Sequence, residues 1–357
     1  MEARERTLRA LEFDGPDRAP RELWLLPWAE FHHPAELEAI RKDFPADLIT
    51  APASYGAPPA TEGAQHKVGT YRDEWGCKFV NIQDGVMGEV KQPLIQDWEK
   101  DGAGVRFPEG WLTFDREEVD SFCRSEKRFV RANCCPRPFE RLQFLRGPAN
   151  LYLDLAQPPP GFFAFIQRLH AFYCELLDEW AKTEVDGLMI MDDWGSQRSL
   201  LISPTLWRSL FKPLYKDYIE IAHRHGKKMF MHSDGYILDI VGDLVELGLD
   251  ALNSQVFCMG IESLSSFRGK ICFWGEIDRQ QLLPEGTIEE IQRAVIRFHE
   301  NLSWNGGVIA QCEFGLAAKP ENIREVFRTW DRASWVKERF LLLPGGYERG
   351  LKVETSI

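Results

Sequence analysis

The sequence predicts an α/β fold, a (β/α)8 barrel of the TIM type, and two observations carry this prediction. Short apolar runs alternate along the chain with longer stretches of helical periodicity, a pattern typical of βα units around a parallel sheet. The alternation gives eight strands, which is the number that closes such a barrel. Because barrels of this type exceed the usual domain length as one unit, we expect a single domain over residues 1–357.

Each predicted strand is a short apolar run bounded by turn-forming or polar residues. The strands are residues 21–28, 47–52, 128–135, 187–193, 227–234, 251–255, 271–278 and 306–314. The predicted helices between and after them are residues 34–42, 115–126, 161–183, 204–225, 236–247, 260–268, 288–301 and 320–331. Local signals support several helix ends: Ser203 precedes Pro204, acidic residues follow Thr287, and Gly226 stands after a helix end.

One segment does not fit the βα pattern. Residues 70–95 alternate between polar and apolar positions and contain Asp84-Gly85, a turn signal typical of a β-hairpin. We therefore predict a hairpin inserted into the barrel near residues 70–95. An excursion of this kind could act as a lid over the barrel mouth.

Composition excludes several classes of protein. With 43 Lys and Arg against 55 Asp and Glu, the net charge is −12, so no diffuse basic field attracts nucleic acid. No apolar run approaches the ~18 residues of a membrane span, and residues 1–20 lack the apolar core of an export signal. Eight cysteines without a CxxC pair are typical of free thiols in a reducing compartment. We expect a cytoplasmic protein that binds neither nucleic acid nor membranes.

Polar side chains end five consecutive predicted strands, where the chemistry of a barrel is located. Such residues in apolar strands are costly unless they are used or hydrogen-bonded. They are Asp192 and Asp193, then His232, Ser233 and Asp234, then Asn253 and Gln255, then Glu276 and Asp278, and last Gln311, Cys312 and Glu313. We therefore predict a functional site at this end of the barrel.

Four of these residues are of the types that bind zinc: His232, Asp234, Glu276 and Cys312. Imidazole and thiolate together favour Zn²⁺ over Mg²⁺ or Ca²⁺. The HxD spacing puts His232 and Asp234 on one side of a strand. We rank Glu276 before Asp234 as the further ligand, because Gly235 follows Asp234 and the turn could need that carboxylate. The alternative is a hydrogen-bonded core histidine and a buried thiol.

The other candidates surround this set. Asp192 and Asp193 follow a buried strand, so they could contact substrate or support the metal, or instead fix a loop or cap a helix. Tryptophans beside strand ends could wall a flat ligand. The candidates for catalysis are Asp192, Asp193 and Asp234, and those for substrate contact are Trp28, Trp194, Gln255 and Gln311.

Several motifs resemble those of one known family, the uroporphyrinogen decarboxylase superfamily. They are the segment 15–20 (GPDRAP), the segment 192–197 (DDWGSQ) with the later Ser203-Pro204 and Pro213, the segment 232–235 (HSDG), the segment 275–278 (GEID), and Cys312 followed by the segment 320–323 (PENI). The resemblance covers most of the chain and implies a (β/α)8 barrel. The superfamily contains the haem-pathway decarboxylase and corrinoid-linked methyltransferases.

The resemblance is closer to the methyltransferase branch. The decarboxylase holds substrate carboxylates with an arginine-rich stretch after its first strand, whereas residues 27–33 (PWAEFHH) contain no arginine here. Members of the methyltransferase branch bind zinc through His-x-Cys and a later Cys. His232 and Cys312 match this pattern, but Asp234 stands where the first Cys would be.

The resemblance therefore implies a zinc-dependent methyltransferase that moves a methyl group between a small methylated substrate and a corrinoid protein. The corrinoid would be supplied by that partner protein, and the mixed zinc ligands favour an O-methyl substrate. The alternatives are a tetrapyrrole decarboxylase of the uroporphyrinogen type and a non-catalytic corrinoid- or tetrapyrrole-binding barrel. A homodimer stays open, as do the identities of the methyl donor and acceptor.

Overall fold

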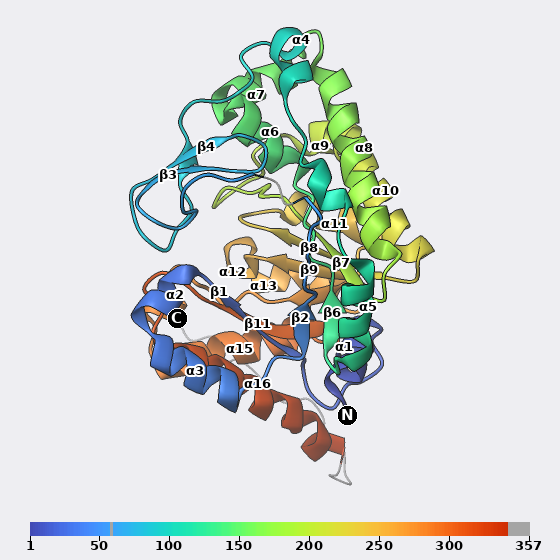
Figure 1. Ribbon diagram of the computed structural model, residues 1–357. Coiled ribbons are helices and arrows are strands. Elements are labelled where there is room, and N and C mark those ends of the chain that lie inside the picture. The colour runs from blue at the N-terminus through green and yellow to red at the C-terminus, as the bar shows by residue number, and fades with distance from the viewer. Residues whose placement is uncertain (58–59, 342–357) are drawn as a thin grey trace, which may run out of the picture.

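An eight-stranded parallel sheet, rolled into a nearly closed barrel, organises the computed structural model, which describes residues 1–57 and 60–341 (Figure 1). The barrel strands are β1 (Arg21–Leu25), β2 (Leu48–Thr50), β6 (Phe129–Arg131), β7 (Gly187–Met191), β8 (Lys228–Ser233), β9 (Ala251–Ser254), β10 (Cys272–Trp274) and β11 (Val308–Phe314). Their order in the sheet is β1-β11-β10-β9-β8-β7-β6-β2. The predicted fold class and all eight predicted strands are confirmed.

The two ends of this order meet through Asp47, at the start of β2. Its backbone N–H donates to the carbonyl of Arg21 at 2.9 Å, and its carboxylate accepts from the Arg21 N–H at 2.7 Å. Arg6 and Arg18 also donate to this carboxylate, at 2.7 and 2.6 Å. A buried carboxylate with several donors thus joins β1 to β2 where ladder hydrogen bonds are sparse.

One apolar cluster identifies the barrel interior, because each of the eight strands contributes to it. Its members are Leu11, Leu48, Phe129, Phe230, Ala251, Cys272, Trp274 and Ile309, with Leu8, Trp24 and Met189 packed against them. The alternate residues of the same strands belong to a second, larger cluster between the strands and the surrounding helices. This division shows which residues of each strand point inward.

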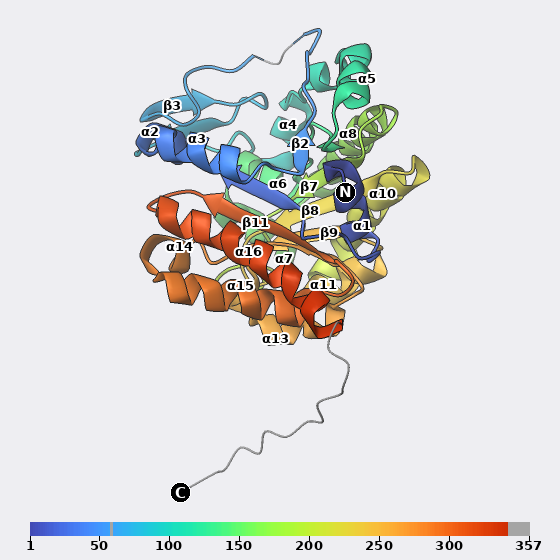
Figure 2. The same ribbon diagram turned by 90° about the horizontal axis from the view of Figure 1, so that it is seen from below.

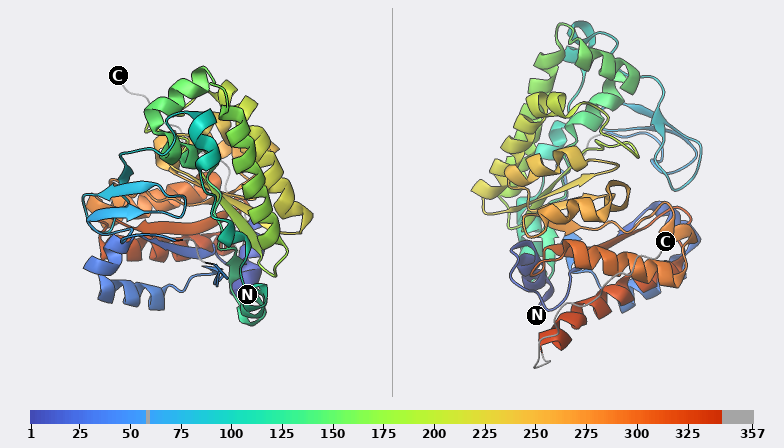
Figure 3. Two further views of the ribbon diagram at one scale, coloured as in Figure 1. Left: turned by 45° about the horizontal axis from the view of Figure 1, so that its top comes forward. Right: turned by 180° about the vertical axis from the view of Figure 1, so that it is seen from behind.

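Helices surround the strands (Figures 2 and 3), and the N-terminal helix packs against the interior cluster through Leu8 and Leu11. The helices longer than two turns are α1 (Ala3–Leu11), α3 (Pro34–Asp43), α5 (Arg116–Ser125), α6 (Pro138–Arg146), α7 (Pro148–Ala156), α8 (Phe162–Ala181), α10 (Lys212–Arg224), α11 (Leu238–Glu246), α15 (Ile288–Leu302) and α16 (Pro320–Leu341). Shorter helical segments are α2 (Pro27–His32), α4 (Trp98–Asp101), α9 (Pro204–Leu210), α12 (Val256–Met259), α13 (Ile261–Leu264) and α14 (Leu282–Glu285). None of the described helices is long and apolar enough to cross a membrane.

Three predicted elements differ from the structure. The first strand ends at Leu25 because Pro27 begins α2, so Trp28 lies on a helix. The predicted helix 204–225 is two helices, α9 and α10, separated at Phe211. The segment 260–268 contains the short α13 and a single 3₁₀ turn.

The segment predicted as a hairpin forms a small antiparallel sheet of three strands. These are β3 (Gly69–Arg72), β4 (Lys78–Asn81) and β5 (Glu89–Val90), and Asp84-Gly85 lies in the loop between β4 and β5. The turn between β3 and β4 is fixed by the Asp73 carboxylate, which accepts from the backbone of Cys77 at 2.7 Å and from Arg141 of α6 at 2.5 Å. The sheet is thus attached to α6, and its action as a lid stays a prediction.

Candidate functional site

Polar side chains replace the apolar interior cluster at the carboxyl ends of the barrel strands. His232 stands two residues after Phe230 on β8, and Glu276 stands two residues after Trp274, just beyond β10. Because side chains alternate along a strand, residues two positions apart share a face. The inward face therefore continues from the apolar core into a polar barrel mouth.

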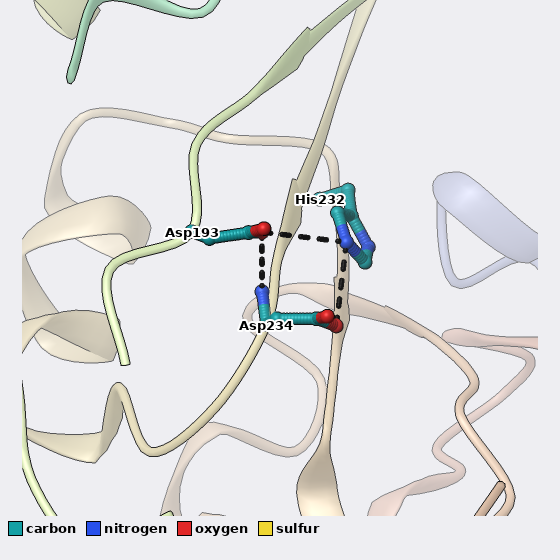
Figure 4. Close-up of side chains that lie close together, drawn as sticks. All are labelled: Asp193, His232 and Asp234. Atoms are coloured by element: carbon teal, nitrogen blue, oxygen red, sulfur yellow. Dashed lines mark hydrogen bonds and ion pairs between the residues drawn. The ribbon is translucent and has the colours of Figure 1, made fainter. Parts of the chain in front are cut away.

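Asp193, His232 and Asp234 meet at this mouth (Figure 4). One candidate ligand atom from each of the three lies within 4.8 Å of the others. His232 Nε2 is 3.4 Å from Asp234 Oδ1 and 3.7 Å from Asp193 Oδ1, and the imidazole is buried. An imidazole and two carboxylates form a donor set that a metal ion could occupy.

Hydrogen bonds behind His232 fix which of its ring nitrogens faces the two aspartates. Its Nδ1 lies 2.5 Å from the side-chain oxygen of Asn253, whose amide nitrogen donates to the backbone carbonyl of Trp274. The Asn253 oxygen must therefore accept, so Nδ1 carries the proton and donates it. Nε2 therefore faces Asp193 and Asp234, and in the neutral ring its lone pair points toward them, as in metal-binding histidines that are oriented by a partner behind the ring.

The two carboxylates are held so that one oxygen of Asp234 stays free. Asp234 Oδ2 accepts from Arg279, while its buried Oδ1 has no hydrogen-bond partner among the described residues. Asp193 Oδ1 accepts from the Asp234 backbone N–H at 3.1 Å. Burial, and then the nearby Asp234 carboxylate, raises the pKa of Asp193. A divalent cation would give Oδ1 of Asp234 a partner and would offset the repulsion between the Asp193 and Asp234 carboxylates. The three residues therefore fit a zinc ion.

Arg279, which the sequence reasoning missed, connects three carboxylates of the mouth. It donates to Asp234, donates to Glu313 Oε2 at 2.9 Å, and places Nε 3.6 Å from Glu276 Oε2. The only sequence signal for Arg279 is its position directly after the segment 275–278. That position is in a loop, and the path of the loop depends on tertiary contacts that the sequence pattern does not reveal. Burial raises the pKa of Glu276 to about 8, against the lowering effect of Arg279.

The structure does not bring Cys312 or Glu276 into the group formed by Asp193, His232 and Asp234. Cys312 lies on the outward face of β11, in the apolar cluster between strands and helices, whereas Ile309 of the same strand lies inside. Burial raises the pKa of the Cys312 thiol, which opposes the thiolate form that binds metal. Cys312 was expected to bind the same metal ion as His232, but the alternation of side chains along β11 directs it toward the helices instead.

Asp192 and Trp194 have structural partners on the outer side of the barrel. The Asp192 carboxylate accepts from the backbone N–H groups of Phe139 and Glu140, at 2.9 and 2.7 Å, and from the Tyr215 hydroxyl at 2.5 Å. It therefore caps the N-terminus of α6. Trp194 is fully buried, so it offers no face to a ligand, and its indole N–H donates to the same hydroxyl at 2.8 Å.

The remaining candidates for substrate contact lie at the mouth or close to it. Trp28 stacks on the His32 ring within α2, with the ring centroids 4.5 Å apart. Gln255 Oε1 accepts from the Gly235 N–H at 3.1 Å. Gln311 is fully buried on the inward face of β11, and neither atom of its amide group has a hydrogen-bond partner among the described residues. Their contact with substrate stays a prediction.

Two cavities open near these residues. One of about 220 Å³ lies beyond β9 and β10 and is lined in part by Gln255, Glu276 and Arg279. A larger one of about 670 Å³ extends from the ends of β1 and β6 to the loop between β4 and β5, and Arg137 and Met87 are among the residues that line it. The inserted sheet therefore forms part of the wall of a cavity that begins at the barrel strands.

One solved structure agrees with this architecture. The chain is similar in structure to a methyltransferase from Methanosarcina mazei, with a TM-score of 0.63 and 14% identity over 93% of this chain and 99% of that one. At this identity the likeness is one of fold. An endo-β-1,4-xylanase from Gloeophyllum trabeum matches with a TM-score of 0.42 and 8% identity over 91% and 98% of the two chains.

The sequence comparisons identify the family. A search of curated proteins gave no match. The sequence signature described as "Uroporphyrinogen decarboxylase (URO-D)" matches residues 138–333, which is more than half of the chain and includes β7 to β11 with all three residues of the candidate metal group. The chain belongs to the uroporphyrinogen decarboxylase (URO-D) family.

Proposed function

We propose that this protein is a zinc-dependent methyltransferase that moves a methyl group between a small O-methylated substrate and a corrinoid protein. The observation that carries the proposal is the group of Asp193, His232 and Asp234, in which an imidazole nitrogen faces two carboxylates and one Asp234 oxygen has no hydrogen-bond partner among the described residues. The family and the fold likeness to a methyltransferase support the reaction class.

These three side chains would hold the zinc ion and leave an open position for substrate. When bound, zinc supplies Lewis-acid polarisation of the ether oxygen, and the partner's corrinoid supplies the methyl acceptor. Carboxylate oxygens are harder ligands than thiolates, so this donor set favours an oxygen substrate over a thiol. Asn253 keeps the imidazole in the tautomer that can coordinate, and Arg279 orients the Asp234 carboxylate.

Glu276 is placed to handle the proton that the reaction needs. Cleavage of the methyl–oxygen bond leaves the electron pair on the substrate oxygen, which then takes up a proton. Glu276 Oε1 is buried without a hydrogen-bond partner among the described residues, and burial raises the pKa of this carboxyl group to about 8 in the chain without a metal ion, which favours the protonated form. Its side chain can therefore donate that proton without a water molecule.

The pairing of the arginines near the mouth argues against the decarboxylase alternative. A polycarboxylate substrate needs cationic side chains that are free to pair with it. Arg137 is paired with Glu140 at 2.9 Å, Arg141 with Asp73 at 2.5 Å, and Arg279 with the carboxylates of the mouth. Each of these arginines is thus already neutralised by a carboxylate of the chain.

Metal content and methyl transfer test the proposal together. The purified protein is expected to bind about one zinc per chain, and a corrinoid protein with its cobalt reduced should become methylated in the presence of a small methyl ether. His232→Ala should abolish both zinc binding and transfer, whereas His225→Ala, whose ring pairs with Asp178 away from the mouth, should keep both. Full transfer by metal-free protein would refute the proposal.

A further inference from the structure

The cavity of about 220 Å³ beyond β9 and β10 has a wall that is rich in amide groups. Four glutamines line it: Gln197, Gln255, Gln280 and Gln281. The volume is below the ~300–1,000 Å³ typical of pockets for drug-sized ligands, so it suits a small molecule. Each amide offers both a donor and an acceptor, which is the chemistry that recognises hydroxyl groups.

Glu276 lines this cavity and has a buried carboxyl oxygen without a hydrogen-bond partner among the described residues. The residue is 1% exposed, and the unpartnered oxygen is Oε1. A buried polar atom without a partner costs about 1–3 kcal/mol. A rotation of the carboxyl group that brings this oxygen to a ligand hydroxyl would remove this cost, so Glu276 adds a buried hydrogen-bonding group to the wall.

Among the described residues that line the cavity, Arg279 is the only cation and carboxylates already pair with it, which argues against an anionic ligand. Arg279 is paired with Asp234 and Glu313. The Asp278 carboxylate accepts from the backbone N–H groups of the two residues that follow Arg279, at 2.9 and 3.0 Å. Burial also favours the neutral form of Glu276. The wall therefore presents hydrogen-bonding groups and no unpaired cation.

The amides keep part of their capacity for a ligand. Gln197 Nε2 donates to Gln280 Oε1 at 2.9 Å. This bond leaves the Gln197 carbonyl oxygen and the Gln280 NH₂ group for a ligand. Gln255 accepts from the Gly235 N–H through Oε1, which leaves its NH₂ group. Donors and acceptors are thus both available, as a molecule with adjacent hydroxyl groups requires.

The cavity adjoins the candidate metal group through two direct links. Gln255 binds the backbone of Gly235, which follows Asp234, and Arg279 of the cavity wall donates to the Asp234 carboxylate. We propose that this cavity binds the hydroxyl-bearing part of a small neutral substrate, so that the methyl donor is a hydroxylated methyl ether. The inference rests on the proposed function for its reaction, but the binding can be tested separately.

The test measures binding of two probes to the purified full-length protein by ligand-detected NMR. The first probe is 3-methoxypropane-1,2-diol, and the second is 1,2,3-trimethoxypropane, which lacks hydroxyl groups. The diol is expected to bind at least about 10-fold more tightly, because each lost hydrogen bond to a buried group costs about 1 kcal/mol or more. Equal binding of the two probes would overturn the proposal.

Three variants locate the binding site. Cys258→Phe fills the cavity and should abolish diol binding, and Gln281→Leu, at an exposed edge of the wall, should weaken it several-fold while the fold is kept. Glu285→Gln is the control, since Glu285 is exposed, lies near the cavity in sequence and does not line it. Unchanged diol binding in Cys258→Phe or Gln281→Leu would contradict the assignment.

Zinc content measured on the same samples separates the two proposals. If the parent protein binds one zinc per chain but shows no preference for the diol, the cavity assignment alone is refuted. Selective diol binding without any zinc binding would refute the proposed metal-dependent reaction and leave the cavity assignment standing.

Discussion

Glu276 should make the stability of this protein fall as the pH rises through the neutral range. Its pKa in the folded chain is about 8, against 4.5 for an ordinary glutamate, and burial is the main cause. Because the folded state holds the proton more tightly than the unfolded state, the free energy of unfolding begins to fall once the pH exceeds about 4.5. The loss of stability continues until the pH passes the folded value of about 8.

The size of the effect follows from the gap between the two pKa values. A gap of about 3.5 pH units, at 1.36 kcal/mol for each, sets a ceiling of roughly 5 kcal/mol above pH 8. The same relation gives a penalty of about 1 kcal/mol at pH 5 and about 3 kcal/mol at pH 7. Glu276→Gln removes the ionisation and keeps the side-chain volume, so the variant should gain about 2–3 kcal/mol over the parent between pH 5 and pH 7.

Urea unfolding of both proteins at pH 5, 6, 7 and 8 measures this difference. A chelator is present throughout, because a cation bound at Asp193, His232 and Asp234 would favour ionised Glu276. Glu285→Gln, at an exposed position, is the control and should follow the parent at every pH. A stability difference for Glu276→Gln that stays within about 0.5 kcal/mol over the range would refute the conclusion that burial keeps this carboxyl group neutral.

Three further substitutions separate ligands from supporting residues. Asn253→Ala should weaken zinc binding by about 10–100-fold in a competition with a chelator, since it removes the acceptor that orients His232; an unchanged affinity would contradict this role. Asp192→Ala should lower the free energy of unfolding by about 2–4 kcal/mol, because it removes a helix cap and the partner of the Tyr215 hydroxyl. Its zinc content should remain that of the parent, and a loss would show that Asp192 supports the metal. Cys312→Ala should also keep about one zinc per chain, and a metal-free variant would restore Cys312 as a ligand.

The fold could be predicted from the sequence because strand length and helix spacing leave a clear trace in a barrel of βα units. The eight apolar runs were sufficient to define the eight strands. The errors lie where local chemistry competes with the pattern. Pro27 ended β1 early, and α1 was missed because its sequence, ARERTLRAL, is too charged to show a clear apolar face. The helix α6 was missed because it starts directly after Arg137 in a Pro-rich segment.

The candidate site was predicted in position but not in composition. His232 and Asp234 were expected to share a face of one strand, and the structure places them together. Asp193 was expected beside the site and joins the group itself, whereas Asp192 turns outward to cap α6. Arg279 could not be found from its spacing, because its contacts come from three different strand ends.

The two faces of a barrel strand explain why the sequence alone placed Cys312 with His232. Every residue of β11 is buried, because one face packs inside the barrel and the other against helices, so hydrophobicity cannot distinguish the faces. Polarity can: Gln311 and Glu313 alternate with Val308, Ala310, Cys312 and Phe314, which are all apolar or weakly polar. Gln311 and Glu313 share the face of Ile309, which lies inside the barrel, so they face its interior and mouth whereas Cys312 faces the helices. The same alternation separates Asp193 from Asp192 just beyond β7, since Asp193 shares its face with the inward Met189 and Asp192 shares the opposite face with Ile190.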